Sequence, residues 1–174
     1  MGTGIIVCGL NGSGKSTLGK ALAEALGFHF IDNEDLFFPK TDPGYIFASP
    51  RSRKEVEKLL MEEVRAHENF VLAAVKGNYG EDILPFYHYA VMLDVPKDIR
   101  MQRVRNRSFQ KFGDRMLPGG DLYEREEAFF ALADSRTEHD VEDWAKSLSC
   151  PIIRVDGTKP IAENIVLIIE QMQK

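Results

Sequence analysis

The residues Gly9 to Thr17 have the types and spacing of a loop that binds phosphate groups. They fit the pattern Gly-x-x-x-x-Gly-Lys-[Ser/Thr]. The glycines let the backbone curl with its N–H groups pointing inward, and the start of a helix adds positive potential. Lys15 supplies a cation for the β- and γ-phosphates of a nucleotide, and the Ser16 hydroxyl can ligate Mg²⁺. The expected phosphate contacts are Asn11, Gly12, Ser13, Gly14, Lys15, Ser16 and Thr17.

The residues on either side of this loop predict the elements that would position it. Residues 4–8 form an apolar run typical of a buried strand. Leu18, Leu22, Ala25 and Leu26 recur at helical spacing after the loop, and Gly27 is placed to end that helix. Strand, loop and helix therefore agree with a phosphate site.

A group of acids follows a second predicted strand at residues 28–31. The segment reads Asp32-Asn33-Glu34-Asp35. In a parallel sheet, ligands bind beyond the carboxyl ends of the strands. The three carboxylates therefore suggest a place for Mg²⁺ and a general base. Helix capping by Asp32 or Asn33 is the alternative, and the two roles can coexist.

Residues 36–69 are the expected acceptor-binding region. Aromatic residues between 37 and 47 either wall a pocket or cover the core. Ser52 to Glu55 is a capping box that opens a helix. Cations at a helix start oppose its dipole, so Arg51 and Arg53 favour an anionic ligand, against the alternative of a solvated basic face. A third strand at 70–75 is followed by the further candidates Lys76, Gly77, Asn78 and Tyr79, unless this segment is a plain turn.

The second half of the chain carries arginines and a glycine-rich segment. A helix is expected over 97–107, with Arg103 and Arg107 on one face, where planar guanidinium groups suit a polyphosphate. Residues 108–121 predict a mobile lid with a glycine hinge, carrying Arg115. Asp121 would cap the next helix, with Arg136 near the middle of that helix. A fifth strand at 151–155 leads into a tight loop formed by Asp156, Gly157 and Thr158.

Composition limits the classes of protein that fit. The chain has 174 residues, 44% of them hydrophobic, and a net charge of −5. We expect one domain over 1–174, and the acidic balance argues against a nucleic-acid partner. Cys8 and Cys150 imply no disulfide framework, and no apolar run suits a membrane span. We expect a cytoplasmic protein that is a monomer or a homodimer.

Strands and helices alternate along the whole chain. This pattern predicts an α/β fold, in which a five-stranded parallel sheet is covered by helices on both faces.

The nucleotide-binding half resembles the small P-loop kinases of the adenylate, shikimate and gluconate kinase group. The strongest match is Gly9 to Thr17. Val91 to Pro96, followed by Arg103 and Arg107, is similar to the fourth strand and lid helix of these enzymes. Ile153 to Thr158 is similar to their adenine-contacting loop. The resemblance implies the P-loop NTPase fold of nucleoside monophosphate kinases, with a lid.

The acceptor half resembles the same group less closely. Ile31 to Leu36 is similar to the Asp-x-Asp segment of shikimate and gluconate kinases, with Glu34 as the second acid. Ala74 to Tyr79 is similar to the Ala-Leu-Lys-x-x-Tyr segment of gluconate kinases. Residues 37–53 and 107–121 depart from those families, so the acceptor is not named by the sequence.

The resemblance implies transfer of the γ-phosphoryl group of Mg·ATP to a small molecule, through a hydroxyl acceptor. Ser16 and Asp32 would hold Mg²⁺, and Asp32 and Glu34 would also meet the acceptor. Either Glu34 or Asp35 would accept the proton of the acceptor hydroxyl. A nucleoside monophosphate kinase is one alternative, since Arg51 and Arg53 could clamp an acceptor phosphate. A regulatory NTP-binding ATPase is a more distant one. The implied catalytic residues are Lys15, Asp32, Glu34, Asp35, Arg107, Arg115 and Arg136.

Overall fold

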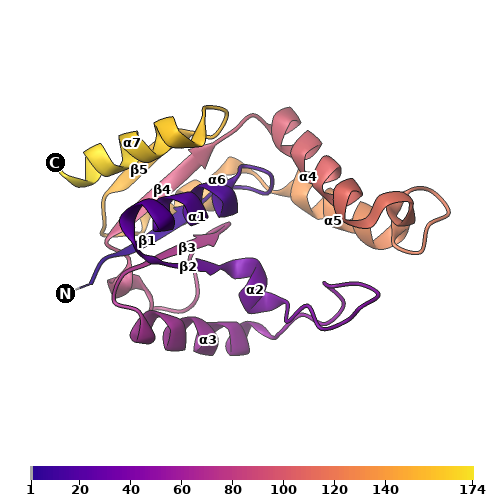
Figure 1. Cartoon of the computed structure of the whole chain (residues 1–174), viewed down its shortest axis with the longest axis horizontal. Coiled ribbons are helices and arrows are strands. Elements are labelled where there is room, and N and C mark those ends of the chain that lie inside the picture. The colour runs from indigo at the N-terminus through magenta and orange to yellow at the C-terminus, as the bar shows by residue number, and fades with distance from the viewer. Residues whose placement is uncertain (1) are drawn as a thin grey trace.

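The computed structural model describes residues 2–174, which fold around a five-stranded parallel sheet (Figure 1). Strand order is β2-β3-β1-β4-β5, and every neighbouring pair is parallel. The predicted α/β class and the parallel sheet are confirmed. The strands are β1 (Gly4–Cys8), β2 (His29–Asp32), β3 (Phe70–Ala74), β4 (Tyr89–Asp94) and β5 (Ile152–Asp156).

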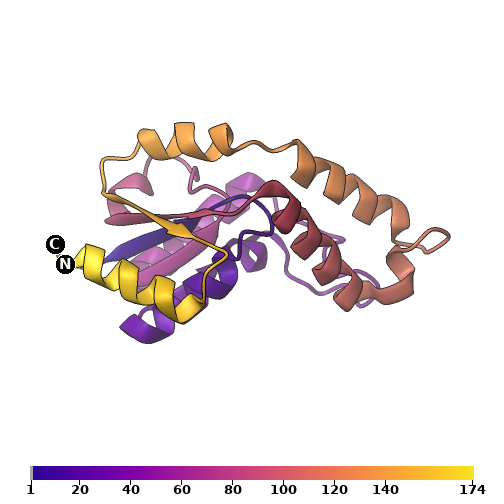
Figure 2. The same cartoon turned by 90° about the horizontal axis from the view of Figure 1, so that it is seen from above.

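Helices cover both faces of the sheet, which confirms the three-layer arrangement (Figure 2). On one face, α1 (Lys15–Leu26) and α7 (Ile161–Met172) bury Leu22 and Ile168 against the alternate strand residues Ile5 and Val7. On the other face lie α3 (Arg53–Ala66) and α6 (Glu138–Lys146). Strand β1, buried on both faces, reads as a continuous apolar run for this reason.

Local signals fix where several elements begin and end. Gly27 adopts a left-handed φ of 70° and ends α1. The Ser52–Glu55 capping box opens α3, with the Ser52 N–H donating to Glu55 Oε2 at 2.8 Å. Asp32 caps the short helix α2 (Asn33–Phe37) by accepting a hydrogen bond from the Glu34 N–H at 2.9 Å. All three predictions are confirmed.

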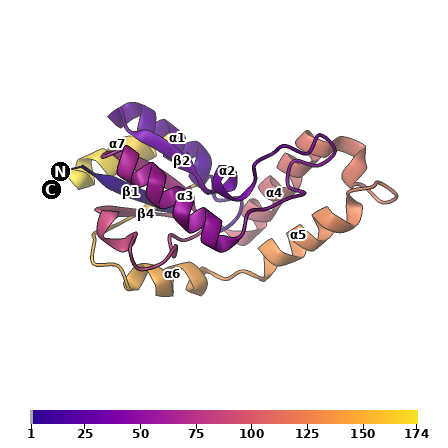
Figure 3. The ribbon, with the colours of Figure 1, turned by 90° about the horizontal axis from the view of Figure 1, so that it is seen from below.

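Two long helices form an arm that projects beyond the sheet (Figures 1 and 3). It consists of α4 (Lys97–Phe112), the 3₁₀ turn η2 (Gly113–Met116) and α5 (Tyr123–Ser135). Its small apolar core contains Val104, Met116 and Phe130, separate from the two clusters that cover the sheet.

The prediction of an irregular flap over 108–121 is wrong in part. Helix α4 continues to Phe112, since Ser108 is buried on its inner face and Gly113, at φ 56°, provides the stop. Gly120 is not a hinge: a Cβ there would lie 2.1 Å from the Arg115 carbonyl oxygen, so the residue is required by a tight turn.

Two further predictions on this side of the chain are wrong, and one helix is present that was not predicted. Asp121 does not cap α5, whose N-cap is Leu122, because its carboxylate is bound by Arg115. Arg136 follows α5 as its C-cap and does not lie within the helix. The acidic stretch after Arg136 forms α6, where the Asp140 carboxylate accepts from the Thr137 N–H at 2.9 Å.

The sequence before β4 predicts a short helix over 81–87 that is broken by Pro85, and the structure has less helix there. This segment contains only a 3₁₀ turn, η1 (Leu84–Phe86), because Pro85 lacks the N–H that a longer helix would use. No helix within residues 2–174 is long and apolar enough to cross a membrane.

Candidate functional site

The predicted phosphate loop connects the end of β1 to the start of α1. Gly12 and Gly14 have left-handed φ values of 80° and 91°, and a Cβ at Gly12 would lie 2.2 Å from the Arg100 carbonyl oxygen. Gly14 is the N-cap of α1, and no side chain of the described residues caps this helix. The N–H groups of its first turn therefore have no partner in the helix, and an anion would supply one.

The Ser13 hydroxyl is a second unpaired polar group in the loop. Within residues 2–174 it is fully buried and makes no hydrogen bond. Buried polar groups are nearly always satisfied in folded proteins. Together with the uncapped helix start, this hydroxyl shows that the donor set of the loop fits a phosphate ligand.

Lys15 lies half-buried at the start of α1. The pKa of its ammonium group is lowered to about 8, mainly by burial and then by the charge of Arg107. The carboxylates of Asp32 and Glu34 raise this pKa, and the charge of Arg136 lowers it. The loop thus has more positive than negative charge around it, and a polyphosphate would correct that imbalance.

Three arginines hold the loop from the side of the arm. Arg100 is 3% exposed; its Nε donates to the Val95 carbonyl at 3.1 Å and its Nη1 to the Asn11 carbonyl at 3.4 Å. Arg103 donates to the Gly12 carbonyl at 3.3 Å. Arg136 Nη1 donates to Asn11 Oδ1 at 2.7 Å. The loop is therefore fixed by the first turns of α4 and by the α5–α6 junction.

Arg100 was not among the predicted site residues. The signal in the sequence was its spacing, since it lies three residues before Arg103 and shares a helix face with it. Arg107 is exposed and makes no hydrogen bond within the described chain, yet its charge lowers the pKa of Lys15. The structure does not bring Arg115 to the loop. That residue lies in η2 and donates two hydrogen bonds to Asp121, at 2.7 and 2.9 Å.

The loop after β5 packs directly against the phosphate loop. A Cβ on Gly157 would lie 2.9 Å from the Ser13 carbonyl oxygen, and Arg103 Nη2 donates to the Gly157 carbonyl at 3.2 Å. Asp156 Oδ1 accepts from the N–H and the hydroxyl of Thr158, which fixes the turn. The residues expected near a nucleotide base are thus placed beside those expected near its phosphates.

A group of acids follows β2, with Asp32 at the end of the strand and Glu34 and Asp35 in α2. Ser16 and Asp32 line the same surface pocket. Glu34 is half-buried, 3.0 Å from the Lys40 ammonium group and 3.8 Å from that of Lys111. Asp35 is exposed and lies 2.7 Å from Lys40. The charges of Asp32 and Glu34 raise the pKa of Lys15 in the phosphate loop, and Asp35 is not among the groups that act on it.

The basic residues of the expected acceptor region are engaged with the protein itself. Arg51 Nη1 donates to the carbonyls of Asp35 and Leu36 at 3.1 and 2.9 Å, so it holds the end of α2. Arg53 Nε pairs with Glu57 at 3.2 Å.

The segment after β3 is joined to the start of α3 and to α2. Arg53 donates to the Asn78 carbonyl and lies over the Tyr79 ring, and the Tyr79 hydroxyl donates to Asn33 Oδ1. Burial raises the pKa of Tyr79. Gly77 is required by packing, because a Cβ would lie 2.6 Å from the Tyr87 hydroxyl. Lys76 is half-buried in the same segment.

The segment between α2 and α3 reaches the arm, a contact that the sequence left open. The Tyr45 hydroxyl donates to Glu126 Oε1 at 2.7 Å, and Glu126 is only 2% exposed. Phe47 packs edge-on against Phe112, and Lys111 lies over the Phe47 ring. The space between the acids and the arm is thus bounded by aromatic side chains, with lysines at its edge.

Fold and loop together define a nucleotide-binding P-loop architecture. The family model described as AAA domain (AAA_18) matches residues 5–127. The chain therefore belongs to this family and is a small P-loop kinase of the adenylate, shikimate and gluconate kinase group.

Individual relatives agree with this assignment. Shikimate kinase from Gloeobacter violaceus is 30% identical over 151 residues, which cover 78% of this chain and 82% of that protein. The uncharacterized protein YqaC from Bacillus subtilis is 28% identical over 178 residues, covering 97% and 96% of the two chains. A gluconokinase structure from Sinorhizobium meliloti 1021 shares the fold, with a TM-score of 0.58 at 20% identity, covering 97% and 90% of the two chains.

Proposed function

We propose that this kinase transfers the γ-phosphoryl group of ATP to a hydroxyl of a small-molecule acceptor. The observation that carries the proposal is the position of Asp32 and Glu34, whose negative charges both raise the pKa of Lys15. A carboxylate beside the transferred group can accept the proton of a hydroxyl, whereas a phosphate acceptor needs no base. The shikimate kinase and gluconokinase relatives are consistent with such an acceptor.

The phosphate loop and the residues around it would bind Mg·ATP. The first-turn N–H groups and Lys15 would hold the phosphates, and Ser16 and Asp32, which share a pocket, would hold the metal ion. Bound Mg·ATP supplies the phosphoryl group, and the metal neutralises part of the phosphate charge. The loop around Gly157 would contact the base.

Glu34 is the better candidate for the general base. It is half-buried and its charge raises the pKa of Lys15, whereas Asp35 is exposed; both carboxylates lie beside Lys40, Glu34 at 3.0 Å and Asp35 at 2.7 Å. Lys111, 3.8 Å from Glu34, comes from the arm, so the proposed acceptor position lies between α2 and α4.

Two arginines would stabilise charge on the transferred group. Arg107 and Arg136 both act on the pKa of Lys15, and Arg107 has a guanidinium without a partner in the described chain. Such groups stabilise the transition state of phosphoryl transfer by electrostatics rather than by covalent chemistry. Arg115, bound to Asp121 at the far end of the arm, would need a movement of the arm to take part.

The position of Arg51 weighs against a nucleoside monophosphate acceptor. Its Nη1 donates to two backbone carbonyls at the end of α2, so the guanidinium is fixed to that helix and only its Nε and Nη2 groups are left for an acceptor phosphate.

The test is ADP release from Mg·ATP with a panel of sugars, sugar acids, shikimate, aminoglycosides and nucleoside monophosphates. We expect one hydroxyl acceptor to raise turnover far above background. Lys15→Ala should lower kcat/KM by about a hundredfold or more, since it removes an electrostatic contact to the transferred group. Near-normal turnover in that variant would contradict the proposed role of the loop.

Matched variants separate the two acids. Glu34→Gln should lower kcat by about 10²-fold or more, the usual contribution of a general base, while Asp35→Asn should leave it within a few-fold of the original. Equal losses in both variants, or stimulation by nucleoside monophosphates alone, would exclude Glu34 as the base for a hydroxyl.

A further inference from the structure

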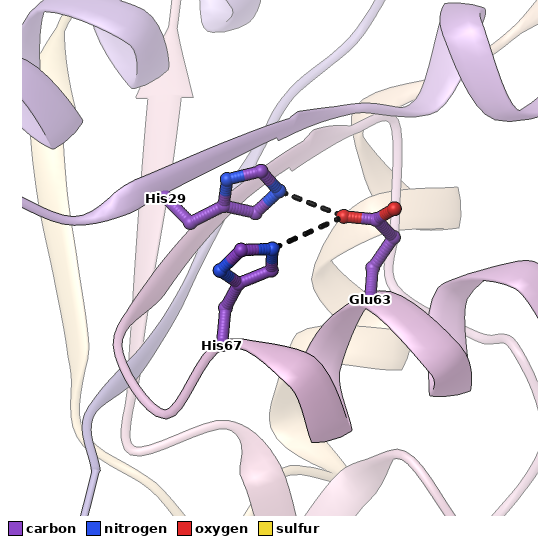
Figure 4. A group of neighbouring side chains, drawn as sticks. All are labelled: His29, Glu63 and His67. Atoms are coloured by element: carbon purple, nitrogen blue, oxygen red, sulfur yellow. Dashed lines mark hydrogen bonds and ion pairs between the residues drawn. The ribbon is translucent and has the colours of Figure 1, made fainter.

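A second cluster of chemically capable side chains lies away from the phosphate loop. His29 is the first residue of β2, whose opposite end carries Asp32. Glu63 lies in the last turn of α3, and His67 is the C-cap of that helix. The three side chains converge on one point between the strand and the helix (Figure 4).

The geometry of the cluster is that of three ligands facing a common centre. Glu63 Oε2 lies 2.7 Å from His29 Nε2 and 3.8 Å from His67 Nε2. The two imidazole rings are stacked, with centroids 3.6 Å apart and planes 14° from parallel, so both Nε2 atoms point to the same side. One ligand atom from each residue lies within 4.8 Å of the other two.

The backbone holds these residues in place before any ligand arrives. Glu63 and His67 are four residues apart, so they share one face of α3. The His29 N–H donates to the Asn69 carbonyl at 3.0 Å, and His29 is paired with Phe70 in the sheet. His29 is thus fastened to the chain immediately after His67.

A simple ion pair explains this arrangement poorly. The side chains of Glu63 and His67 are each 43% exposed, and ion pairs at such exposure contribute little to stability. The two imidazoles are stacked, and both Nε2 atoms lie beside one carboxylate oxygen. This arrangement gathers three atoms that can each give an electron pair to a bound cation.

The kind of cation follows from the ligand set. Two imidazoles and one carboxylate suit Zn²⁺ and similar divalent transition metals, whereas Mg²⁺ prefers oxygen ligands alone. Metal–ligand bonds of about 2.0 Å in a tetrahedral site place ligand atoms about 3.3 Å apart. The contacts of 2.7 and 3.8 Å lie on either side of that spacing.

We propose that His29, Glu63 and His67 bind one divalent transition-metal ion, with Zn²⁺ the best fit. The fourth position is open to water, since three protein ligands fill a tetrahedral site incompletely. The ion joins the start of β2 to the end of α3. It binds the folded chain only, because the unfolded chain separates His29 from the helix, and it therefore stabilises the fold.

The first experiment is calorimetric titration of untagged, chelator-treated protein with ZnCl₂ in the absence of nucleotide. We expect one ion bound per chain and a rise in Tm, with no such rise on adding MgCl₂. His67→Ala and Glu63→Gln should each weaken Zn²⁺ binding at least about tenfold. His139→Ala, which removes an exposed histidine on α6, is the matched control and should keep full affinity.

Histidine side-chain ¹⁵N resonances provide a readout independent of stability. Added Zn²⁺ should shift the Nε2 signals of His29 and His67 and leave those of His88 and His139 unchanged. The proposal is overturned if Zn²⁺ shifts none of these signals. Equal Zn²⁺ affinity in Glu63→Gln and His139→Ala, both folded by circular dichroism, would overturn it as well. Neither measurement depends on the kinase activity.

Discussion

The hydrogen bond between Arg136 and Asn11 joins the end of the arm to the phosphate loop, and a double-mutant cycle would measure its strength. Arg136→Met removes the guanidinium and keeps most of the apolar stem. Asn11→Ala removes the acceptor oxygen. The two single variants, the double variant and the original protein complete the cycle.

The structure sets the expected size of the coupling. Arg136 Nη1 and Asn11 Oδ1 are 2.7 Å apart, the distance of a strong charge-assisted hydrogen bond. Hydrogen bonds to charged groups contribute about 1.5–3 kcal/mol net. Both side chains are only half-buried, so water competes for them and we expect a coupling of about 1 kcal/mol.

The assay is urea denaturation of the nucleotide-free protein, with the coupling taken from the four free energies of unfolding. Arg105→Met combined with Asn11→Ala is a control cycle, because Arg105 lies on α4 and pairs with Glu127. That cycle should be additive. A coupling below about 0.3 kcal/mol for Arg136 and Asn11, which is within ordinary additivity, would refute the contact as a link between arm and loop.

Two further predictions concern titratable groups that are removed from water in part or in full. Because burial lowers the Lys15 pKa to about 8, the unfolded chain holds more protons than the folded one above that pH. Stability of the nucleotide-free protein should therefore rise between pH 8 and 10. ATP binding at pH 8.5 should take up most of one proton, measurable by titration calorimetry in two buffers and absent in Lys15→Ala. Tyr45→Phe removes the hydrogen bond of the buried Glu126 carboxylate and should lower the free energy of unfolding by about 1–3 kcal/mol in urea. Tyr123→Phe is the control, because Tyr123 begins α5, the helix that carries Glu126. Equal stability of the two variants would contradict a stabilising hydrogen bond from Tyr45 to Glu126.

The parts of the fold that local sequence determines were predictable. The strand–loop–helix around Lys15 follows from glycine spacing and apolar periodicity, and the start of α3 follows from the Ser52–Glu55 box. Asp32 was predicted both as a helix cap and as a metal ligand. The structure confirms the first role, and the second remains a proposal.

The parts that depend on distant contacts were not predictable. Gly120 reads as a hinge until the Arg115 carbonyl is seen against it. The arm core unites Val104 with Phe130, and no local pattern pairs them. Helix α6 was missed because its cap uses Asp140, a shorter acid than the Glu or Gln of the usual box.

The arginines show the same limit for the site. Arg100 and Arg103 lie one turn apart and are chemically identical in the sequence, yet only Arg100 is buried against the Val95 carbonyl. Arg115 was expected near the nucleotide because of its charge. Its bond to Asp121 depends on a turn whose path the sequence did not reveal.

The separate apolar core of the arm has an evolutionary consequence. Val104, Met116 and Phe130 pack with one another and not with the clusters on the sheet. Substitutions in this core, away from the arginines that hold the phosphate loop, should therefore perturb the sheet little, while they alter the surface that faces the acids after β2. Duplicated genes for such a chain can diverge in their choice of acceptor through this layer, with the phosphate loop and its supporting sheet inherited unchanged.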